Sequence, residues 1–274
     1  MTAQETTPLA VAISGQKGQS FLVQVFLLVR RSLLTISRAP EALLPPIFIS
    51  LFFLVIYQST LGRASDFIPG ISGSYLGFIL PLSIVSSALS GAGIAAQNLV
   101  RDLERGYFDK LVLTPISRAA LLLGPILAGS VILGFQAAIV VVVALLLGLH
   151  SATGVLGLLV VIGLAVLLGT GFAGFTVSAA LGSGSAAATQ GASFIFFPLT
   201  FLAPTFVPID LLSGWLKVAA QLNPITYVLE AMRAILNIGW DGAAIWKGVL
   251  ACLILAAITY ALAATALRMR TRRQ

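Results

Sequence analysis

Between Ala119 and Ile209 the sequence contains no Asp, Glu, Lys or Arg. A soluble domain cannot form its surface from such a stretch, because soluble domains carry roughly 25% charged residues. A helix of about 20 apolar residues crosses a bilayer, so this stretch can cross a membrane three times. Polar breaks near His150 and Gly182 divide it. We therefore predict transmembrane helices near 119–148, 154–181 and 188–206.

The rest of the chain is also apolar. Of its 274 residues, 58% are hydrophobic and only 9% are charged. Three further apolar runs predict spans near 43–61, 74–100 and 243–267. Prolines between Pro198 and Pro208 predict that the fifth of the six spans ends irregularly. We expect an all-α polytopic membrane protein with six transmembrane helices over residues 41–267.

Residues 21–40 are apolar but contain Arg30, Arg31 and Arg38. At 100° per residue, one side of a helix would carry the apolar residues Leu22, Val25, Phe26, Val29, Leu33 and Ile36. An ordinary first span is the alternative, but three arginines make it costly. We predict an amphipathic helix in the membrane interface, with its arginines among the headgroups. Residues 1–20 are expected to form a flexible cytoplasmic N-terminus.

The segment 101–118 is the most polar internal part of the chain, with seven charged residues. It must lie outside the hydrocarbon, and it is the natural docking point for a partner subunit. The alternative is that its charges only keep a loop solvated. We single out as coupling residues Asp102, Glu104, Arg105, Gly106, Lys110, Thr114, Pro115 and Arg118.

The segment 207–240 is too amphipathic for a span and too apolar for a free loop. Its aromatic residues, such as Trp215 and Trp240, are typical of a headgroup interface. Glu230 and Arg233 are three residues apart, so on a helix they would share a face and are expected to pair. The residues singled out here are Pro208, Asn223, Pro224, Tyr227, Glu230 and Arg233.

The basic residues orient the chain. Twelve of the sixteen fall on one side of the predicted topology: Lys17, Arg30, Arg31, Arg38, Arg101, Arg105, Lys110, Arg118, Arg268, Arg270, Arg272 and Arg273. The other side holds Arg63, Lys217, Arg233 and Lys247. The positive-inside rule therefore places both termini, including a basic tail at 268–274, in the cytoplasm of a multi-pass protein of the inner (plasma) membrane.

The sequence offers little for catalysis. It has one histidine and one cysteine, Cys252, and no metal-binding HExxH or CxxC pattern, so we expect no enzyme activity and no metal site. The net charge of +7 is spread between apolar spans, which argues against nucleic-acid binding. Spans three to five lack ionisable side chains, which disfavours ion-coupled transport. No Walker A sequence occurs, so any ATP must be hydrolysed by a separate subunit.

Two groups of residues resemble a known family. Glu104-Arg105-Gly106, Lys110-Leu111 and Thr114-Pro115-Ile116-Ser117-Arg118 are similar to the signature loop of type-2 ABC exporter permeases. Pro198, Pro208, Trp215 and Asn223-Pro224-Ile225-Thr226-Tyr227, followed by Glu230 and Arg233, resemble the same family's C-terminal motif. Arg38-Ala39-Pro40 looks closest to the daunorubicin and multidrug-resistance branch.

The resemblance implies that 41–267 is the permease domain of an exporter for a hydrophobic or amphipathic compound, a drug or a lipid. It implies two copies of a cytoplasmic ABC ATPase that bind ATP and magnesium, and a second permease, either an identical copy or a similar chain. The 21–40 helix and the 101–118 coupling segment would contact the ATPases, and 207–240 would form re-entrant outer helices. The alternatives are a polysaccharide or lipid-linked glycan exporter, and a self-sufficient secondary carrier or membrane scaffold.

Overall fold

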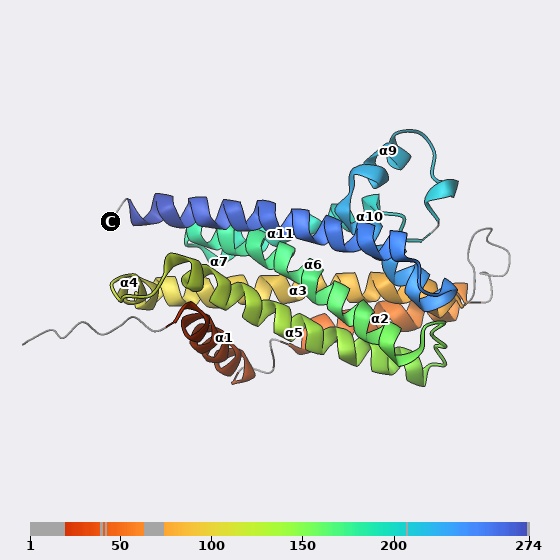
Figure 1. Ribbon diagram of the computed structural model, residues 1–274, viewed down its shortest axis with the longest axis horizontal. Coiled ribbons are helices and arrows are strands. Elements are labelled where there is room, and N and C mark those ends of the chain that lie inside the picture. The colour runs from red at the N-terminus through yellow and green to blue at the C-terminus, as the bar shows by residue number, and fades with distance from the viewer. Residues whose placement is uncertain (1–19, 39–40, 42, 63–73, 207, 273–274) are drawn as a thin grey trace, which may run out of the picture.

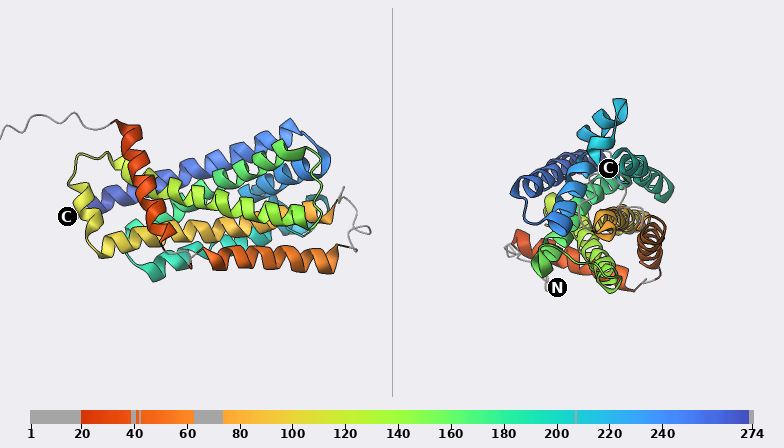
Figure 2. Two further views of the ribbon diagram at one scale, coloured as in Figure 1. Left: turned by 90° about the horizontal axis from the view of Figure 1, so that it is seen from below. Right: turned by 90° about the vertical axis from the view of Figure 1, so that its right-hand side faces the viewer.

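The computed structural model describes residues 20–38, 41, 43–62, 74–206 and 208–272, and in these ranges it contains helices and no strand. Four helices are long and apolar enough to cross a membrane: α3 (Tyr75–Glu104), α5 (Arg118–Leu146), α6 (Gly154–Ser183) and α11 (Gly242–Thr271). They lie side by side along the longest axis of the molecule (Figure 1). The shorter apolar helix α2 (Leu44–Leu61) runs along the same bundle (Figure 2). The all-α prediction is therefore confirmed, while the number of crossings stays a prediction.

Several sequence predictions fall on residues outside these ranges. They include residues 1–19 of the expected flexible N-terminus, residues 39 and 40 of the interfacial helix, and the end of the basic tail at 273–274. Helix α11 extends four residues beyond the predicted span end at 267, so that Arg268 and Arg270 lie in its last turn. Cations are favourable there because the C-terminal end of a helix carries partial negative charge.

Helix α6 lies at the centre of the bundle, where small residues let its neighbours approach closely. A Cβ atom added at Gly171 would lie 2.8 Å from Leu255 of α11, and one at Gly174 would lie 2.7 Å from the Thr259 hydroxyl of α11. A Cβ added at Gly169 would lie 2.5 Å from a side chain of α5. Membrane helices lack a hydrophobic drive to associate, so such close packing is their main source of stability.

The fifth predicted span, 188–206, is not one continuous helix. The structure has α7 (Ala186–Ser193), a turn at 194–195 and α8 (Phe196–Leu202). Pro198 explains the break, because it has no N–H to donate to the carbonyl of Phe194 and its ring crowds that carbonyl. The Phe194 carbonyl accepts from the Phe197 N–H instead, at 3.1 Å. The expected irregular end of this span is present, since residues 203–206 are not helical, but the break at 194–195 was not predicted.

The segment between α8 and α11 is made of short helices at one end of the bundle. In order they are η3 (Ile209–Leu211), α9 (Gly214–Leu222), α10 (Pro224–Arg233) and the π-helix η4 (Ala234–Ile238). Helix α4 (Tyr107–Val112) and the C-terminal end of α11 lie at the opposite end (Figure 1). The described structure therefore separates the predicted outer motif from the predicted coupling segment by the length of the bundle.

Helix α1 (Phe21–Ser37) crosses the bundle steeply near the end that carries α4 (Figure 2). Leu22 and Phe26 of its predicted apolar face are exposed by 76% and 64%, while Leu28, outside that face, is buried, and the interfacial placement of the helix stays a prediction. The helix has two apolar sides: Leu28 and Ile36 pack on the bundle, whereas Leu22 and Phe26 point away from it. A helix between protein and lipid requires such an arrangement.

The close contact between α6 and α11 gives the first testable prediction. Gly174→Ala is expected to destabilise the protein by about 1–3 kcal/mol, because the methyl group overlaps Thr259. Gly163→Ala in the same helix is the control, since a Cβ atom there meets no atom within 4 Å. Both variants are unfolded thermally in detergent, and unfolding is detected by dye labelling of Cys252, which is buried in the folded protein. Equal melting temperatures for the two variants would contradict the packing argument.

Candidate functional site

The 101–118 segment folds as a tight reversal between two long helices rather than as an open loop. Helix α3 continues to Glu104, and Gly106 then reverses the chain with φ = 65°. A residue with a Cβ atom is disfavoured in this left-handed conformation by roughly 1–2 kcal/mol, so glycine is required by the backbone. Helix α4 begins at the next residue, and its Phe108 is buried against the bundle.

The chain leaves α4 by a second ordered turn. The Thr114 hydroxyl donates to the Leu111 carbonyl at 2.6 Å, and Pro115 follows, where a helix cannot continue. Ser117 then caps α5, because its hydroxyl accepts from the Ala120 N–H at 3.2 Å. Each of these contacts involves backbone groups, so the segment is a short rigid connection between α3 and α5.

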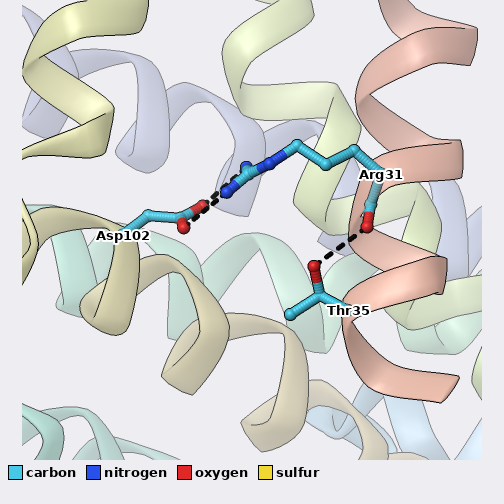
Figure 3. Close-up of polar contacts among 3 residues, drawn as sticks. All are labelled: Arg31, Thr35 and Asp102. Carbon is cyan, nitrogen blue, oxygen red and sulfur yellow. Dashed lines mark hydrogen bonds and ion pairs between the residues drawn. The ribbon is translucent and has the colours of Figure 1, made fainter. Parts of the chain in front are cut away.

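Helix α1 is tied to this reversal by an ion pair. The Arg31 guanidinium donates two hydrogen bonds to the Asp102 carboxylate, at 2.8 and 2.6 Å, and Figure 3 shows it reaching from α1 to α3. The same guanidinium lies over the Tyr107 ring, 4.0 Å from its centroid. The hydrogen bond to Asp102 raises the pKa of Arg31 above its usual value, against the opposing effect of burial. One side chain of α1 thus contacts both helices of the reversal.

A second set of contacts holds α1 to the start of α5. The Gln24 side-chain oxygen accepts from the Ser117 N–H at 2.9 Å. Leu28 packs with Ala120 and Leu121, and a Cβ atom added at Gly124 would lie only 2.6 Å from the Leu28 side chain. Helix α1 therefore holds the reversal at the end of α3 and at the beginning of α5.

The predicted coupling residues divide into two groups. Asp102 is half-buried and bound to Arg31, and the role of Gly106 lies in its backbone conformation. The exposed coupling residues are Glu104, Arg105, Lys110, Thr114, Pro115 and Arg118. Sequence reasoning missed Leu113, which is 87% exposed at the tip of the reversal. The apolar run Leu111-Val112-Leu113 in a charged segment was the available signal.

The arginines of α1 also fall into two groups, exposed and paired. Arg30 and Arg38 are exposed, as residues of an interfacial helix would be. The expectation that Arg31 lies among headgroups was wrong, because Asp102 and Tyr107 bind it. Sequence alone could not pair Arg31 with Asp102, since 71 residues separate them.

The residues of the predicted outer motif are ordered at the opposite end. Asn223 caps α10 by accepting from the Ile225 N–H at 3.0 Å, and Pro224 occupies the first turn. The Tyr227 hydroxyl donates to the Gln221 carbonyl at 2.7 Å. The predicted pairing of Glu230 with Arg233 was wrong: the buried Arg233 guanidinium donates to backbone carbonyls instead.

A cavity of about 330 Å³ opens among α2, α3, α7 and α8. This volume lies at the lower end of the range for sites that bind drug-sized molecules. Six of its thirteen lining residues are aromatic: Phe53, Tyr57, Phe194, Phe197, Phe201 and Phe206. The polar lining residues are Ser86, Gln190, Ser193, Thr200 and Thr205. None of its lining residues is charged, so the cavity suits an apolar or weakly polar molecule.

The described residues contain no group of three or more His, Cys, Asp or Glu side chains placed to hold a metal ion. What they form is an apolar helical bundle with a rigid charged reversal at one end and a cavity between its helices. These features are typical of the membrane-embedded part of a transport protein.

Comparison with known proteins identifies the family. The sequence profile of the ABC-2 type transporter family matches residues 23–237, and the chain belongs to this family. The chain is 24% identical to a probable doxorubicin resistance ABC transporter permease protein, DrrC, of Mycobacterium tuberculosis, over 84% of this chain and 82% of that protein. It is 27% identical to the daunorubicin resistance ABC transporter permease protein DrrB1 of Streptomyces coeruleorubidus, over 76% and 72%. The resemblance found in the sequence motifs is thereby confirmed.

A further relative is the putative transport permease ycf38 of Cyanophora paradoxa. It is 26% identical to this chain over 78% of the chain and 74% of the relative. These relatives are named as permeases, which supports reading this chain as a transport subunit.

The link between Arg31 and Asp102 gives the second prediction. Because the pair is bidentate and half-buried, its coupling free energy should reach about 1 kcal/mol, the upper end of the range for exposed pairs. A double-mutant cycle of Arg31→Gln and Asp102→Asn, read by thermal unfolding in detergent, measures that coupling. The same cycle on Arg30 and Asp102 is the control and should give none. Additive effects of Arg31→Gln and Asp102→Asn would refute the link.

Proposed function

We propose that the chain is the permease subunit of an ABC exporter that moves a hydrophobic or amphipathic compound, with ATP hydrolysed by a separate subunit. The observation that carries this proposal is the rigid reversal at 101–118. It exposes a row of charged residues and Leu113, while α1 fixes it to both long helices. A partner that binds there would move α3 and α5 directly.

The expected partner is a cytoplasmic ABC ATPase, in two copies, which binds ATP and magnesium. Glu104, Arg105, Lys110 and Arg118 offer both signs of charge for pairing across an interface. Leu113 adds an exposed apolar side chain at the tip, and burying it in a pocket of the partner would contribute favourable free energy. A second permease, identical or similar, would complete the transporter.

The proposed topology follows the same geometry. The end with α4 and the C-terminal end of α11 would face the cytoplasm of the inner (plasma) membrane, with α1 in the interface. The six predicted spans would be α2, α3, α5, α6, the α7–α8 pair and α11. The short helices from η3 to η4 would then form the re-entrant outer segment, and both termini would be cytoplasmic.

The cavity supports a hydrophobic or amphipathic compound as substrate. Five phenylalanine rings and one tyrosine offer a large apolar contact area, beside five uncharged polar side chains. Glycan export remains the alternative, since sugars also stack on aromatic rings. A glycan, however, presents many hydroxyl groups, which phenylalanine cannot satisfy. A secondary carrier is disfavoured because ion coupling usually needs an ionisable residue in the path, and this lining has none.

The third prediction tests the coupling surface. Leu113→Ala should weaken binding to the ATPase by about tenfold to a hundredfold, since burying a leucine is worth roughly 1.5–3 kcal/mol. Glu104→Ala and Gly106→Ala should lower coupled ATP hydrolysis as well. Co-purification with an ABC ATPase encoded beside this chain, followed by hydrolysis assays, measures both effects. Leu222→Ala is the control, because Leu222 is 80% exposed on α9 at the other end. If all three variants bind the ATPase and support ATP hydrolysis as the wild type does, the 101–118 segment is not the coupling surface.

The fourth prediction tests the cavity. Ser193→Trp places a large ring in the cavity and should reduce efflux of an aromatic drug such as doxorubicin by more than about tenfold. Binding of the ATPase should be unchanged, because the cavity lining contains no residue of the 101–118 reversal. Ser183→Trp, at an exposed serine outside the lining, is the matched control. Efflux that survives Ser193→Trp unchanged would rule the cavity out as the substrate site.

A further inference from the structure

Arg233, at the end of α10, is a cation that is only 8% exposed. Its Nε donates to the Phe78 carbonyl at 3.0 Å, and its two terminal nitrogens donate to the Pro204 and Thr205 carbonyls at 2.6 and 2.7 Å. The guanidinium also lies over the Phe78 ring, 3.6 Å from its centroid. Its hydrogen-bond partners in the described structure are therefore backbone carbonyls of two separate segments.

This arrangement satisfies groups that the fold otherwise leaves without partners. Residues 203–206 follow the end of α8 and are not helical, so the carbonyls of Pro204 and Thr205 have no helical donor. A buried carbonyl must find a donor elsewhere. The planar guanidinium can reach both carbonyls and Phe78 together, whereas a lysine ammonium lacks this fixed fork of donors.

The segment that Arg233 holds is a wall of the cavity. Thr205 and Phe206 both line the cavity, and the Thr205 hydroxyl donates to the Thr200 carbonyl of α8 at 2.5 Å. The Phe206 ring packs edge-on against Tyr57 of α2, with ring centroids 5.2 Å apart. The position of this wall sets the distance between α8 and α2 across the cavity.

Arg233 itself is fixed to the frame of the bundle. The π-helix that follows it turns the Ile235 and Leu236 carbonyls outward, where they accept from the Thr153 hydroxyl at 2.8 Å and the Ala152 N–H at 2.9 Å. On the other side, a Cβ atom added at Gly248 of α11 would lie 2.8 Å from Ala231. The turn between α5 and α6 and helix α11 therefore hold α10 in place.

We infer that Arg233 is a positioning residue for the cavity. Its guanidinium fixes the 204–206 wall against α3 and so determines where the transported compound binds. The link to transport rests on the proposed function, whereas the position of the wall does not. Without the guanidinium, the wall loses its two hydrogen bonds from a charged donor, and the bond from that donor to Phe78 of α3 is lost as well, so the wall should separate from α3. Weaker binding of the compound in the cavity should then raise KM more than it lowers kcat.

The experiment measures the wall and transport separately. Thr205→Cys, combined with Cys252→Ala, places a single thiol in the wall, where the native side chain is 2% exposed. Its rate of reaction with N-ethylmaleimide in native membranes is compared among proteins with Arg233, Arg233→Gln and Arg233→Lys. Arg233→Gln should raise the rate at least about tenfold, since each lost hydrogen bond from a charged donor contributes a factor of about that size. The labelling rate in the Arg233→Lys protein should lie between the rates with Arg233 and with Arg233→Gln.

Three controls make the result decisive. Lys247→Gln removes an exposed positive charge near the start of α11, the helix that packs on α10. It should leave the labelling rate at position 205 unchanged. Labelling of the native Cys252, in proteins that keep Thr205, reports general loosening. If Arg233→Gln also exposes Cys252, the Arg233→Lys protein decides, and an unchanged rate at position 205 in it overturns the inference. Equal rates at position 205 with Arg233 and with Arg233→Gln overturn it directly.

Efflux of the neutral aromatic probe N-phenyl-1-naphthylamine, by the chain together with its ATPase, supplies the transport measurement. A raised KM with a smaller change in kcat for Arg233→Gln supports the role in seating the compound, and an unchanged KM overturns that role. If the wild-type chain moves no probe with any ATPase, the proposed function fails. The labelling rates then still decide whether Arg233 positions the wall.

Discussion

The close approach of α6 to its neighbours is the contact on which the rest of this structure depends. Gly171 and Gly174 face α11, and Gly169 faces α5, at distances that leave no space for a side chain. Lipid is as apolar as the helices, so only such shape complementarity and a few hydrogen bonds select one arrangement. One of these bonds runs from the Thr176 hydroxyl of α6 to the Ala92 carbonyl of α3, at 3.0 Å. The charged reversal, the cavity and the outer helices all extend from this centre.

Helix α3 joins the two ends of the molecule. Near its C-terminus Asp102 binds Arg31 from α1, and near its N-terminus the Phe78 carbonyl binds Arg233 from α10. In each case an arginine makes several hydrogen bonds and also lies over an aromatic ring. At about 1.5 Å per residue, the 30 residues of α3 span roughly 45 Å. Between its two ends α3 contributes Leu82 and Ser86 to the cavity, so a displacement at the reversal would reach the cavity along one helix.

Hydropathy located the helices better than it located their interruptions. The predicted ranges 119–148 and 154–181 differ from α5 and α6 by at most two residues at each end. The reason is that Arg118 and the polar breaks near His150 and Gly182 mark the ends of these apolar runs. The irregular end of the fifth span was predicted, but the break at 194–195 was not, since the effect of Pro198 depends on the carbonyl four residues before it. The coupling segment was recognised by its motif, but Leu113 was not, because exposure of one leucine depends on how the turn projects from the bundle. The aromatic residues from 194 to 206 are close together in the sequence, yet the cavity also needs α2 and α3, which lie far away in the sequence.

The sequence by itself determined that this chain is an all-helical membrane protein of the ABC-2 transporter family. The physical reason is that a stretch without charges must lie in lipid, where the backbone must satisfy its own hydrogen bonds within helices. Only the tertiary structure decided what each arginine does. Arg31 was expected among headgroups and Arg233 beside Glu230, but their partners are Asp102, 71 residues away, and the carbonyl of Phe78, 155 residues away. Such pairings follow from which helix faces meet, and local sequence does not encode that.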